Sequence, residues 1–504
     1  MSRVIGASLL GVEGFPVEVE VRISSLLPKV DIVGLPEAAV RESAARVRAA
    51  IAASGLRFPE RRVTVNLAPA ALRKGGAALD LPIAVGVLAA SGELGEDALG
   101  EVGLIGELAL DGRVRPVRGA LALTLGALRA GSRSVIVPEA NAAEAALATG
   151  ALVLAAASLP QVLAHLRGEA PLARVEAHFD PAAALRDLPE LGDVRGQERA
   201  KRALVVCAAG GHGLLLKGAP GCGKTMLARR LIGLLPPLAF EEAVEVTRIH
   251  GAAGRAAESG AIQCQRPFRS PHHTASTAGL LGGGNPPRPG EVSLAHRGVL
   301  FLDELAEFDR RSLEALRQVL EERRILVARA GLSCVFPADF QLVAATNPCP
   351  CGWLGSGVRD CRCDEGAVAR YLGRLSGPLL DRVDLHLALR PLSWRELSAP
   401  PRDSGAAARA RVEAARARQA QRYAGRAFRR NAELPDAVLD ELVRATPEAW
   451  QLLGRSVEGL ALSARAARRV LKVARSVADL SGREETGAED VAEALSYRPE
   501  GPGA

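Results

Sequence analysis

The residues best suited to chemistry form one unbroken run: Gly218, Ala219, Pro220, Gly221, Cys222, Gly223, Lys224 and Thr225. An apolar run at 213–217 precedes it, and a helix-compatible run follows from Met226. Glycines at this spacing let backbone N–H groups point inward at phosphate oxygens, and the helix N-terminus adds partial positive charge. Lys224 can then reach the β- and γ-phosphates, and the Thr225 hydroxyl can bind Mg²⁺. The run therefore predicts a P-loop that binds a nucleotide.

Two adjacent carboxylates, Asp303 and Glu304, follow the apolar run at 298–302. Such a run is typical of a central buried strand, and open α/β sheets bind their ligands at the carboxyl ends of the strands. We predict that Asp303 holds Mg²⁺, directly or through water, and that Glu304 polarises the attacking water. The alternative is a solvated acidic turn after a core strand. A P-loop earlier in the chain favours the catalytic interpretation.

Three further polar residues occupy positions that suit phosphate chemistry. Asn347 ends an apolar run that starts at Phe340, where its amide could orient water by hydrogen bonding. Arg382 lies on a short segment before another strand, from which it could reach a neighbouring subunit's nucleotide as an arginine finger. Arg465 lies at a helix start, where it could touch the phosphates from a helical region.

Positioning these residues requires a parallel sheet flanked by helices, and the second of three regions supplies the necessary alternation of strands and helices. We expect a multidomain protein of mixed α+β and α/β class. Its predicted parts are an α+β domain over 1–168, a linker over 169–187, an α/β nucleotide-binding core over 188–394 and a helical region over 395–504. Alternating apolar residues over 17–23 predict a strand in the first domain, and Asp111-Gly112 predicts a hairpin turn.

Composition sets looser limits. The chain has 504 residues, 48% of them hydrophobic, with a formal net charge of +7. That charge permits a polyanionic partner, although an arginine-rich solvated surface explains it equally well. The first residues resemble a strand rather than a secretory signal, and the apolar stretch at 145–159 is too short to span a membrane. We therefore expect a cytoplasmic protein without membrane contact.

Four of the eight cysteines fall in one short cluster, as the pairs Cys349/Cys351 and Cys361/Cys363. Four thiolates on one loop could close a tetrahedral Zn²⁺ site. The Cys-x-Cys spacing is shorter than that of most structural zinc pairs, so unliganded loop cysteines remain the alternative. Disulfides are the weaker interpretation in a reducing compartment.

The stretch 266–290 precedes the acidic strand and contains two adjacent histidines, three consecutive glycines and several prolines. We do not expect a regular core element there. It is interpreted as an insertion that faces a central pore and grips substrate, with Arg266, Arg269 and Arg288 available for phosphates. The alternatives are a structured surface loop and, less favoured, a metal site at His272 and His273.

These features, in this order, resemble those of AAA+ ATPases, and more narrowly those of the magnesium-chelatase-like branch and its ComM/YifB family. Family-specific segments are found at 193–203, 266–274 and 347–352. The resemblance implies an ATPase that uses ATP and Mg²⁺, forms a homo-oligomeric, hexameric ring, and acts on branched or single-stranded DNA as a branch-migration helicase in recombination or natural transformation. It also implies a C-terminal helical lid, with Lys224 as the Walker A lysine, Asp303 and Glu304 as the Walker B acids, Asn347 as sensor 1, Arg382 as the arginine finger and Arg465 as sensor 2. The alternative is a chelatase-type ATPase that remodels a protein partner.

The first region resembles the proteolytic domain of Lon proteases, which has a ribosomal S5 domain 2-like fold. Lon enzymes use a serine–lysine dyad. The segments that align with the dyad, at 76–83 and 119–124, contain neither a serine nor a lysine in the required place. We therefore predict a non-proteolytic domain and disfavour an ATP-dependent protease. The basic residues of this region could assist DNA contact or simply form a solvated face: Arg57, Arg61, Arg62, Arg73 and Lys74.

Overall fold

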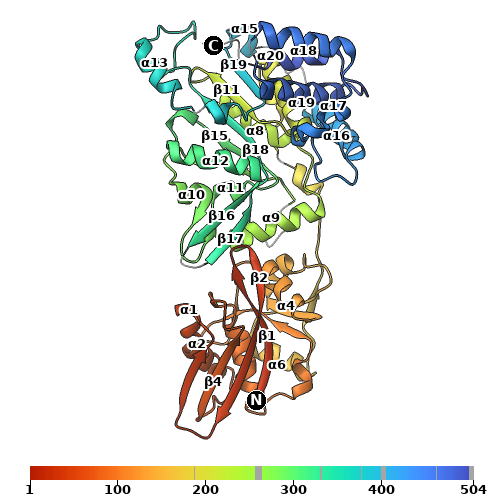
Figure 1. Ribbon diagram of the computed structural model, residues 1–504. Helices are drawn as coiled ribbons and strands as arrows, with labels where there is room; N and C mark the ends of the chain where they lie inside the picture. Colours follow the sequence, from red (N-terminus) through yellow and green to blue (C-terminus); the bar gives the residue numbers. More distant parts are fainter. Residues whose placement is uncertain are drawn as a thin grey trace.

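The computed structural model of the protein describes residues 1–186, 188–255, 264–329, 332–375, 377–398, 405–460 and 462–498. Figure 1 shows three parts in chain order: an N-terminal domain at one end, a central α/β core and a group of helices beside the core at the other end. Within the described residues, no helix is long and apolar enough to cross a membrane.

The N-terminal domain is built on an eight-stranded mixed sheet with the order β10-β9-β8-β5-β1-β2-β4-β3. The predicted alternation is confirmed in β2, where Val17, Val19 and Val21 are buried. The last strand, β10, falls inside the segment that the sequence assigns to the linker, so the sheet extends beyond residue 168. The strands are β1 (Ser2–Leu10), β2 (Glu13–Ser24), β3 (Lys29–Val33), β4 (Arg62–Ala68), β5 (Val102–Leu104), β8 (Ser134–Pro138), β9 (Leu152–Ala156) and β10 (Ala173–Val175).

Helices α3 and α4 pack against strands β1 and β2 of this sheet. The predicted Asp111-Gly112 turn joins a short hairpin, β6 (Glu107–Leu108) and β7 (Val114–Arg115), in which Gly112 has a φ of 86°. The helices of the domain are α1 (Ala38–Arg41), α2 (Ser43–Ala53), α3 (Asp80–Ala90), α4 (Ala120–Arg129), α5 (Ala142–Ala145) and α6 (Leu159–Leu166).

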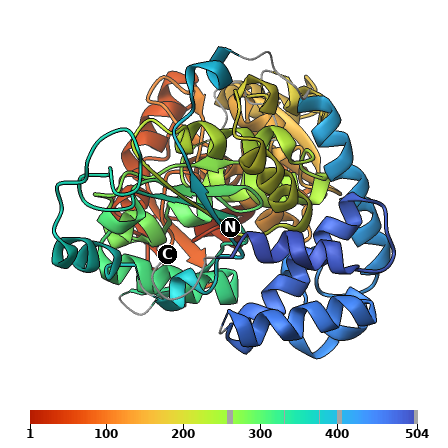
Figure 2. The same ribbon diagram turned by 90° about the horizontal axis from the view of Figure 1, so that it is seen from above.

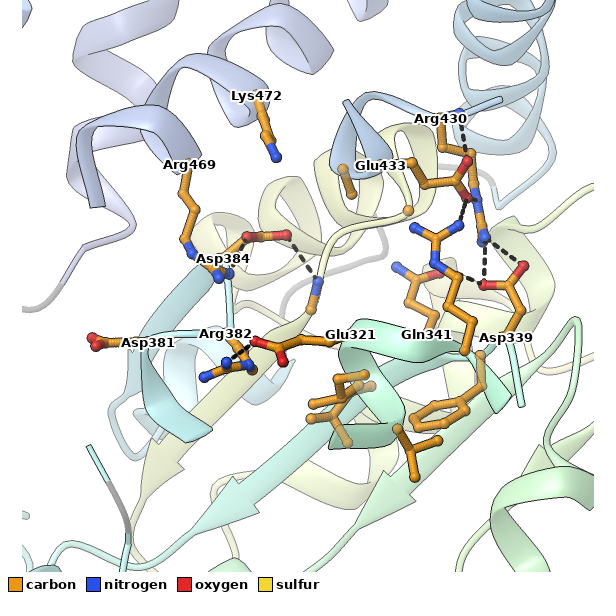
Figure 3. A pocket seen from close by; sticks show the side chains of 18 of the residues that line it. Glu321, Asp339, Gln341, Asp381, Arg382, Asp384, Arg430, Glu433, Arg469 and Lys472 are labelled. Carbon is orange, nitrogen blue, oxygen red and sulfur yellow. Dashed lines mark hydrogen bonds and ion pairs between the residues drawn. The ribbon is translucent and has the colours of Figure 1, made fainter. Parts of the chain in front are cut away.

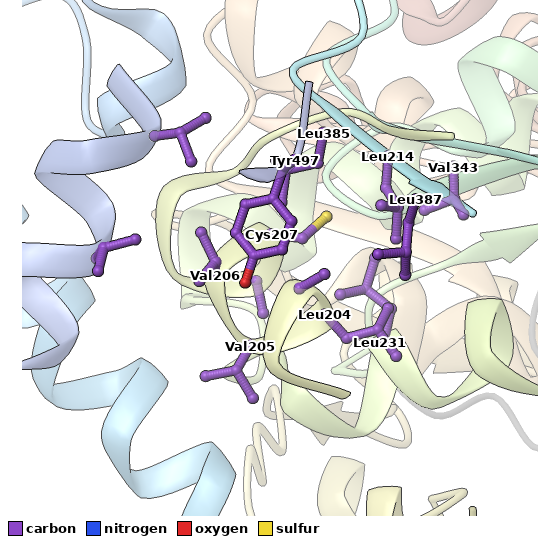
Figure 4. Packing of buried hydrophobic residues seen from close by; sticks show 14 of the residues in the cluster. Leu204, Val205, Val206, Cys207, Leu214, Leu231, Val343, Leu385, Leu387 and Tyr497 are labelled. Carbon is purple, nitrogen blue, oxygen red and sulfur yellow. The ribbon is translucent and has the colours of Figure 1, made fainter. Parts of the chain in front are cut away.

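The central core contains a five-stranded, entirely parallel sheet with the order β12-β15-β18-β11-β19. Its middle strands, β15, β18 and β11, are mostly apolar and largely buried, as expected where helices cover both faces of a sheet. In Figure 4, Leu204 of α7 and Leu231 of α8 pack with Leu214, Val343 and Leu387 from three neighbouring strands. The strands are β11 (Leu214–Gly218), β12 (Phe268–Arg269), β15 (Val299–Leu302), β18 (Gln341–Thr346) and β19 (Leu385–Leu389).

Helices and two hairpins surround this sheet. One hairpin, β16–β17, is inserted between α12 and β18. The remaining elements of the core are α7 (Glu198–Gly210), α8 (Lys224–Leu234), α9 (Phe240–Ala252), α10 (Thr277–Leu281), β13 (Gly282–Gly283), β14 (Arg288–Pro289), α11 (Glu291–Leu294), α12 (Arg310–Glu322), β16 (Arg324–Arg329), β17 (Leu332–Pro337), α13 (Glu365–Leu372), α14 (Gly377–Leu380) and α15 (Trp394–Ser398).

The N-terminal domain docks onto the core through the turn between β1 and β2. Val12 in this turn is 1% exposed and belongs to the same apolar cluster as Phe336 of β17. The neighbouring Glu13 forms an ion pair of 3.1 Å with Arg248 of α9. Figure 1 shows the β1–β2 end pointing at the β16–β17 hairpin, with α4 close to α9. Apolar burial therefore joins the two domains, since an exposed ion pair adds little.

The C-terminal region is helical, as predicted, and forms a lid beside the core. Its long helix α19 packs on α7 and α16, and Tyr497 after α20 inserts into the core cluster shown in Figure 4. Seen from above, the lid helices gather at one side of the core (Figure 2). They are α16 (Gly405–Arg422), α17 (Asp436–Val443), α18 (Pro447–Gly459), α19 (Ala464–Leu480) and α20 (Ala488–Ser496), and residues 499–504 lie outside the described part of the chain.

Candidate nucleotide site

The P-loop connects β11 to α8 and holds Lys224 at the carboxyl edge of the sheet. Gly221 and Gly223 have φ values of 81° and 85°, a left-handed conformation that L side chains rarely adopt. The Lys224 ammonium donates hydrogen bonds to the carbonyls of Gly218 (2.6 Å) and Ala219 (3.0 Å). Burial lowers the pKa of Lys224 from its ordinary value. The loop thus presents a partly desolvated cation at the carboxyl edge of the sheet.

Asp303 and Thr225 meet directly at this edge. The Thr225 hydroxyl donates to Asp303 Oδ2 over 2.7 Å, and the backbone N–H of Glu304 donates to Asp303 Oδ1 over 3.0 Å. A hydroxyl and a carboxylate oxygen in contact form the hard oxygen donor set that Mg²⁺ prefers. The donor chemistry of these two side chains therefore fits the metal that a nucleotide carries.

Asn347 completes the group from the end of β18. Its Oδ1 accepts a hydrogen bond of 2.9 Å from Lys224 Nζ. Because β15, β18 and β11 are adjacent and parallel, the polar residues that end them converge at one edge. The structure thus brings together four of the residues singled out by sequence: Lys224, Thr225, Asp303 and Asn347.

Glu304 has a neighbour that the sequence did not identify. Glu304 itself has a φ of 52°, and its Oε2 lies 3.2 Å from Nδ1 of His273. The sequence marked the His272–His273 doublet only as a weak metal site, because the fold that carries it past the acidic strand was not evident. The imidazole of His273, from the 266–290 segment, therefore contacts the same carboxylate that the sequence predicts to polarise the attacking water.

Arg382 and Arg465 lie at the opposite edge of the same sheet. Both line a cleft of about 330 Å³ together with Gly213, Gln341 and Asp384, which precede or begin strands β11, β18 and β19. Figure 3 shows Arg382, Gln341 and Asp384 in this lining. Five residues of β11 at about 3.3 Å each put roughly 16 Å between this edge and the P-loop. Neither arginine is brought beside Lys224 of its own chain.

The position of Arg465 follows from how α19 packs. Its buried face lies on α7 and α16, and its first turns face Asp384, to which Arg469 forms an ion pair of 3.0 Å. Asp384 also accepts from buried His212 over 3.0 Å. Although burial opposes ionisation, His212 and Arg469 lower the pKa of Asp384 to about 2. This anchored carboxylate fixes the lid at the amino edge of the sheet, which sequence reasoning could not foresee.

The cleft is lined by both basic and acidic side chains, and several arginines lie near Arg382. Burial, and then the charges of Arg317, Arg469 and Arg465, lower the pKa of Arg382. Arg382 is ion-paired with Glu321 and donates to the Pro378 carbonyl over 2.6 Å. Among the described residues, no hydrogen bond or ion pair engages the exposed Arg465 side chain. The two arginines thus line one cleft at the amino edge of the sheet, away from the P-loop of their own chain.

The segment 266–290 differs in part from the expectation. It is irregular apart from β12, α10 and the β13–β14 pair, yet Arg266 is not available for phosphates. Its guanidinium is 10% exposed, forms an ion pair of 2.8 Å with Glu242 and donates to the Arg297 carbonyl over 2.7 Å. Arg269 is ion-paired with Glu291 at 2.6 Å. Only Arg288 of the three remains exposed, since the other two hold the insertion to the core.

The N-terminal domain places the dyad-like segments in buried helices. Residues 76–83 lead into α3, where fully buried Asp80 is ion-paired with Arg46 at 2.6 Å, and residues 119–124 enter α4. Lys74, grouped with a basic face by sequence, is instead fully buried and donates to the Pro69 carbonyl. Lys74 therefore cannot contribute to a surface that contacts DNA.

The loop after Asn347 brings all four clustered cysteines together. Their Sγ atoms lie within 4.8 Å of one another, and none of the four forms a disulfide. Cys349 is buried, and the other three are half-buried.

Comparison with known proteins covers almost the whole chain. The family described as "Magnesium chelatase, subunit ChlI" matches residues 190–397, "Subunit ChlI of Mg-chelatase" matches 19–141, and "Magnesium chelatase, subunit ChlI C-terminal" matches 402–498. An uncharacterized protein of Mycobacterium tuberculosis strain H37Rv is 45% identical over 99% of both chains. The uncharacterized protein YifB of Escherichia coli K12 is 45% identical over 99% of this chain and 97% of its own.

Competence protein ComM of Haemophilus influenzae is 41% identical over 99% of this chain and 97% of its own length. Identity at this level over nearly complete chains extends through the P-loop core, the N-terminal domain and the helical lid alike. The chain therefore belongs to the ComM/YifB family of magnesium-chelatase-like AAA+ ATPases.

Proposed function

We propose that this protein is an ATP-driven, ring-forming motor that moves DNA, with branch migration as its reaction. The observation that carries the ATPase part is the convergence of Lys224, Thr225, Asp303 and Asn347 at one edge of a parallel sheet. In this proposal Lys224 binds the β- and γ-phosphates, and Asn347 orients the attacking water. Glu304 polarises that water and takes up its proton through the carboxylate.

Mg²⁺ would be held by Thr225 and Asp303, and when bound it supplies charge neutralisation at the β- and γ-phosphate oxygens. The protein's own contribution is to aim the donors before the nucleotide arrives. The left-handed glycines of the P-loop leave open space above the backbone, so that phosphate oxygens can approach its N–H groups. Such a preorganised electrostatic site is the main source of rate enhancement in phosphoryl transfer.

The second half of each site belongs, in this proposal, to the next protomer. Arg382 and Arg465 sit at the amino edge of the sheet, roughly 16 Å from their own P-loop by strand length. Head-to-tail packing brings the amino edge of one protomer against the carboxyl edge of the next, and a closed arrangement of this kind is a ring. We propose a hexamer in which both arginines contact the neighbour's phosphates.

DNA as the substrate is supported by the net charge of +7 and by the name of the Haemophilus relative, a competence protein. Arg288 is exposed on the insertion that also carries His273, so a polymer gripped there would act on the same segment that contacts Glu304. Phosphate contacts would make DNA binding sensitive to salt and largely independent of sequence.

The test measures ATP turnover with forked DNA, with linear duplex and without DNA, using Lys224→Ala as the control. We expect stimulation by forked DNA that declines as salt is raised, and no turnover in Lys224→Ala. ATP hydrolysis that no DNA stimulates, together with stimulation by a protein partner, would favour the protein-remodelling alternative and overturn the DNA assignment.

A further inference from the structure

The loop between β18 and α13 folds four cysteines into one compact group. The Sγ atom of Cys349 lies 3.4 Å from that of Cys351 and 3.6 Å from that of Cys361, and Cys351 and Cys361 are 3.6 Å apart. Cys363 joins the group as the acceptor of a hydrogen bond of 3.4 Å from the backbone N–H of Cys351. All four sulfurs lie within 4.8 Å of one another.

These separations suit one tetrahedral ion. With Zn–S bonds of about 2.3 Å, the edge of a regular tetrahedron of sulfurs is about 3.8 Å. The three contacts of 3.4–3.6 Å are close to that edge. They are much longer than the ~2.05 Å of a disulfide. The group is also too small to enclose an iron–sulfur cluster, which would hold the cysteines further apart.

Two backbone N–H groups of the loop donate hydrogen bonds to sulfur atoms of the group. The backbone N–H of Cys351 donates to Cys363 Sγ, as described above. The backbone N–H of Cys363 in turn donates to Cys361 Sγ over 3.5 Å. Such N–H donors stabilise sulfur ligands that carry negative charge. The same loop carries Arg359 and Arg362, which can offset the excess negative charge of four thiolates around a divalent cation.

We propose that Cys349, Cys351, Cys361 and Cys363 bind one structural zinc ion. Four protein ligands leave no open coordination position, so the ion would take no part in catalysis. Each thiol that is protonated before binding releases its proton to solvent as it becomes a ligand. Nothing in this assignment depends on the proposed DNA substrate.

The position of the ion gives it a second consequence, which rests on the proposed role of Asn347. The loop 349–363, which carries the four cysteines, is called the clasp. Cys349 follows Asn347 by two residues, so the clasp begins just after β18 ends at Thr346. Gly352, inside the clasp, lies against the P-loop: a Cβ placed on it would lie 2.7 Å from Pro220 Cδ and 3.8 Å from Asn347 Cγ. A zinc clasp would thus fix the backbone that aims Asn347 at Lys224.

The first test measures metal in the full-length protein. Zinc is quantified by mass spectrometry after removal of any affinity tag and passage through a chelator. We expect about one zinc per chain in the parent. The double variant Cys361→Ser/Cys363→Ser should lose it, and Cys264→Ser, a free cysteine outside the loop, should keep it. Zinc retained by the double variant would overturn the assignment.

A second measurement does not require a variant to fold. The reduced parent protein, stripped of metal, is titrated with Co²⁺ alone. Tetrahedral cobalt bound by four thiolates gives strong visible d–d bands and a sulfur-to-cobalt charge-transfer band. We expect both at one equivalent and their loss when one equivalent of Zn²⁺ is added. A parent protein that holds no zinc as purified and develops no cobalt bands would refute the proposal.

The consequence for the nucleotide site is tested separately. In the double variant we expect ATP turnover to fall at least several-fold while nucleotide binding persists, because Lys224 and the P-loop are unchanged. Zinc loss without any change in turnover would support zinc binding by the four cysteines but refute the role of the clasp in positioning Asn347. A parent that binds zinc but hydrolyses no ATP would instead contradict the proposed function and leave the metal assignment intact.

Discussion

Complementation between two inactive variants tests whether the nucleotide site is shared between protomers. Lys224→Ala removes the cation of the P-loop, and Arg382→Ala removes the arginine at the opposite sheet edge. Each variant should be inactive by itself, because every site in its ring lacks one of the two residues. Roughly 16 Å of β11 separates the two positions, so within one chain they belong to different sites. Removal of an arginine finger costs roughly 10³-fold or more in turnover.

Mixed rings should regain activity. A site is complete only where an Arg382→Ala protomer supplies Lys224 and a Lys224→Ala protomer supplies Arg382. With random assembly at a 1:1 ratio, about one quarter of the interfaces are complete, so turnover should reach about one quarter of the parent rate if the sites act independently.

The assay is steady-state phosphate release after the two variants are mixed and allowed to exchange subunits. The matched control mixes Arg382→Ala with the double variant Lys224→Ala/Arg382→Ala, which forms no complete interface and should stay inactive. Subunit exchange, followed by fluorescence transfer between labelled protomers, must accompany the measurement. Exchange without recovery would refute the shared site and return both arginines to a structural role.

Four further outcomes follow from the structure. Glu304→Gln should bind ATP and form stable rings yet hydrolyse slowly in a phosphate-release assay, and turnover at the parent rate would contradict its role. His273→Ala should raise turnover measured without DNA and reduce its stimulation by DNA, because it frees the Glu304 carboxylate; unchanged turnover and stimulation would mean that the 3.2 Å contact is incidental. Burial and then Arg498 lower the pKa of His386 from 6.5 to about 4. Between these pH values the unfolded chain binds more protons than the folded chain, so the unfolding free energy should fall as pH drops from 6.5 to 4, by about 3 kcal/mol at most. In denaturant titrations, His386→Gln should reduce this dependence on pH. Val12→Ala should lower the unfolding free energy by about 1.5 kcal/mol through lost methyl burial, and an unchanged midpoint would mean that the docked turn is not part of the cooperative unit.

The sequence indicated which polar residues lie near the carboxyl ends of the core strands. Lys224, Asp303 and Asn347 each end or follow a short apolar run, and adjacent parallel strands bring such ends together without knowledge of the loops between them. The order of the strands, which decides that β18 lies between β11 and β15, is a long-range property that no local pattern contains. The contact between Lys224 and Asn347 therefore needed the structure.

Other parts of the fold carry little local signal. Helix α3 is buried on all sides, so its apolar residues show no amphipathic period and the sequence did not indicate it. Lysine is usually exposed, yet the fold buries Lys74, whose backbone forms an isolated bridge with Pro36. Arg465 lies in the first turn of α19, whose direction is set by packing against α7 and α16 and by the Asp384–Arg469 ion pair. The residues next to Arg465 in sequence therefore do not predict which edge of the sheet it lies near.

The most direct test of the proposed motor is branch migration of a synthetic four-way junction. Parent protein, ATP and Mg²⁺ are mixed with the labelled junction, and the products are resolved on a gel, with Lys224→Ala as the matched control. The account predicts conversion of the junction to two duplexes that requires ATP hydrolysis and is absent with Lys224→Ala. A junction that stays intact while the parent hydrolyses ATP, or that resolves equally well with Lys224→Ala, would contradict it.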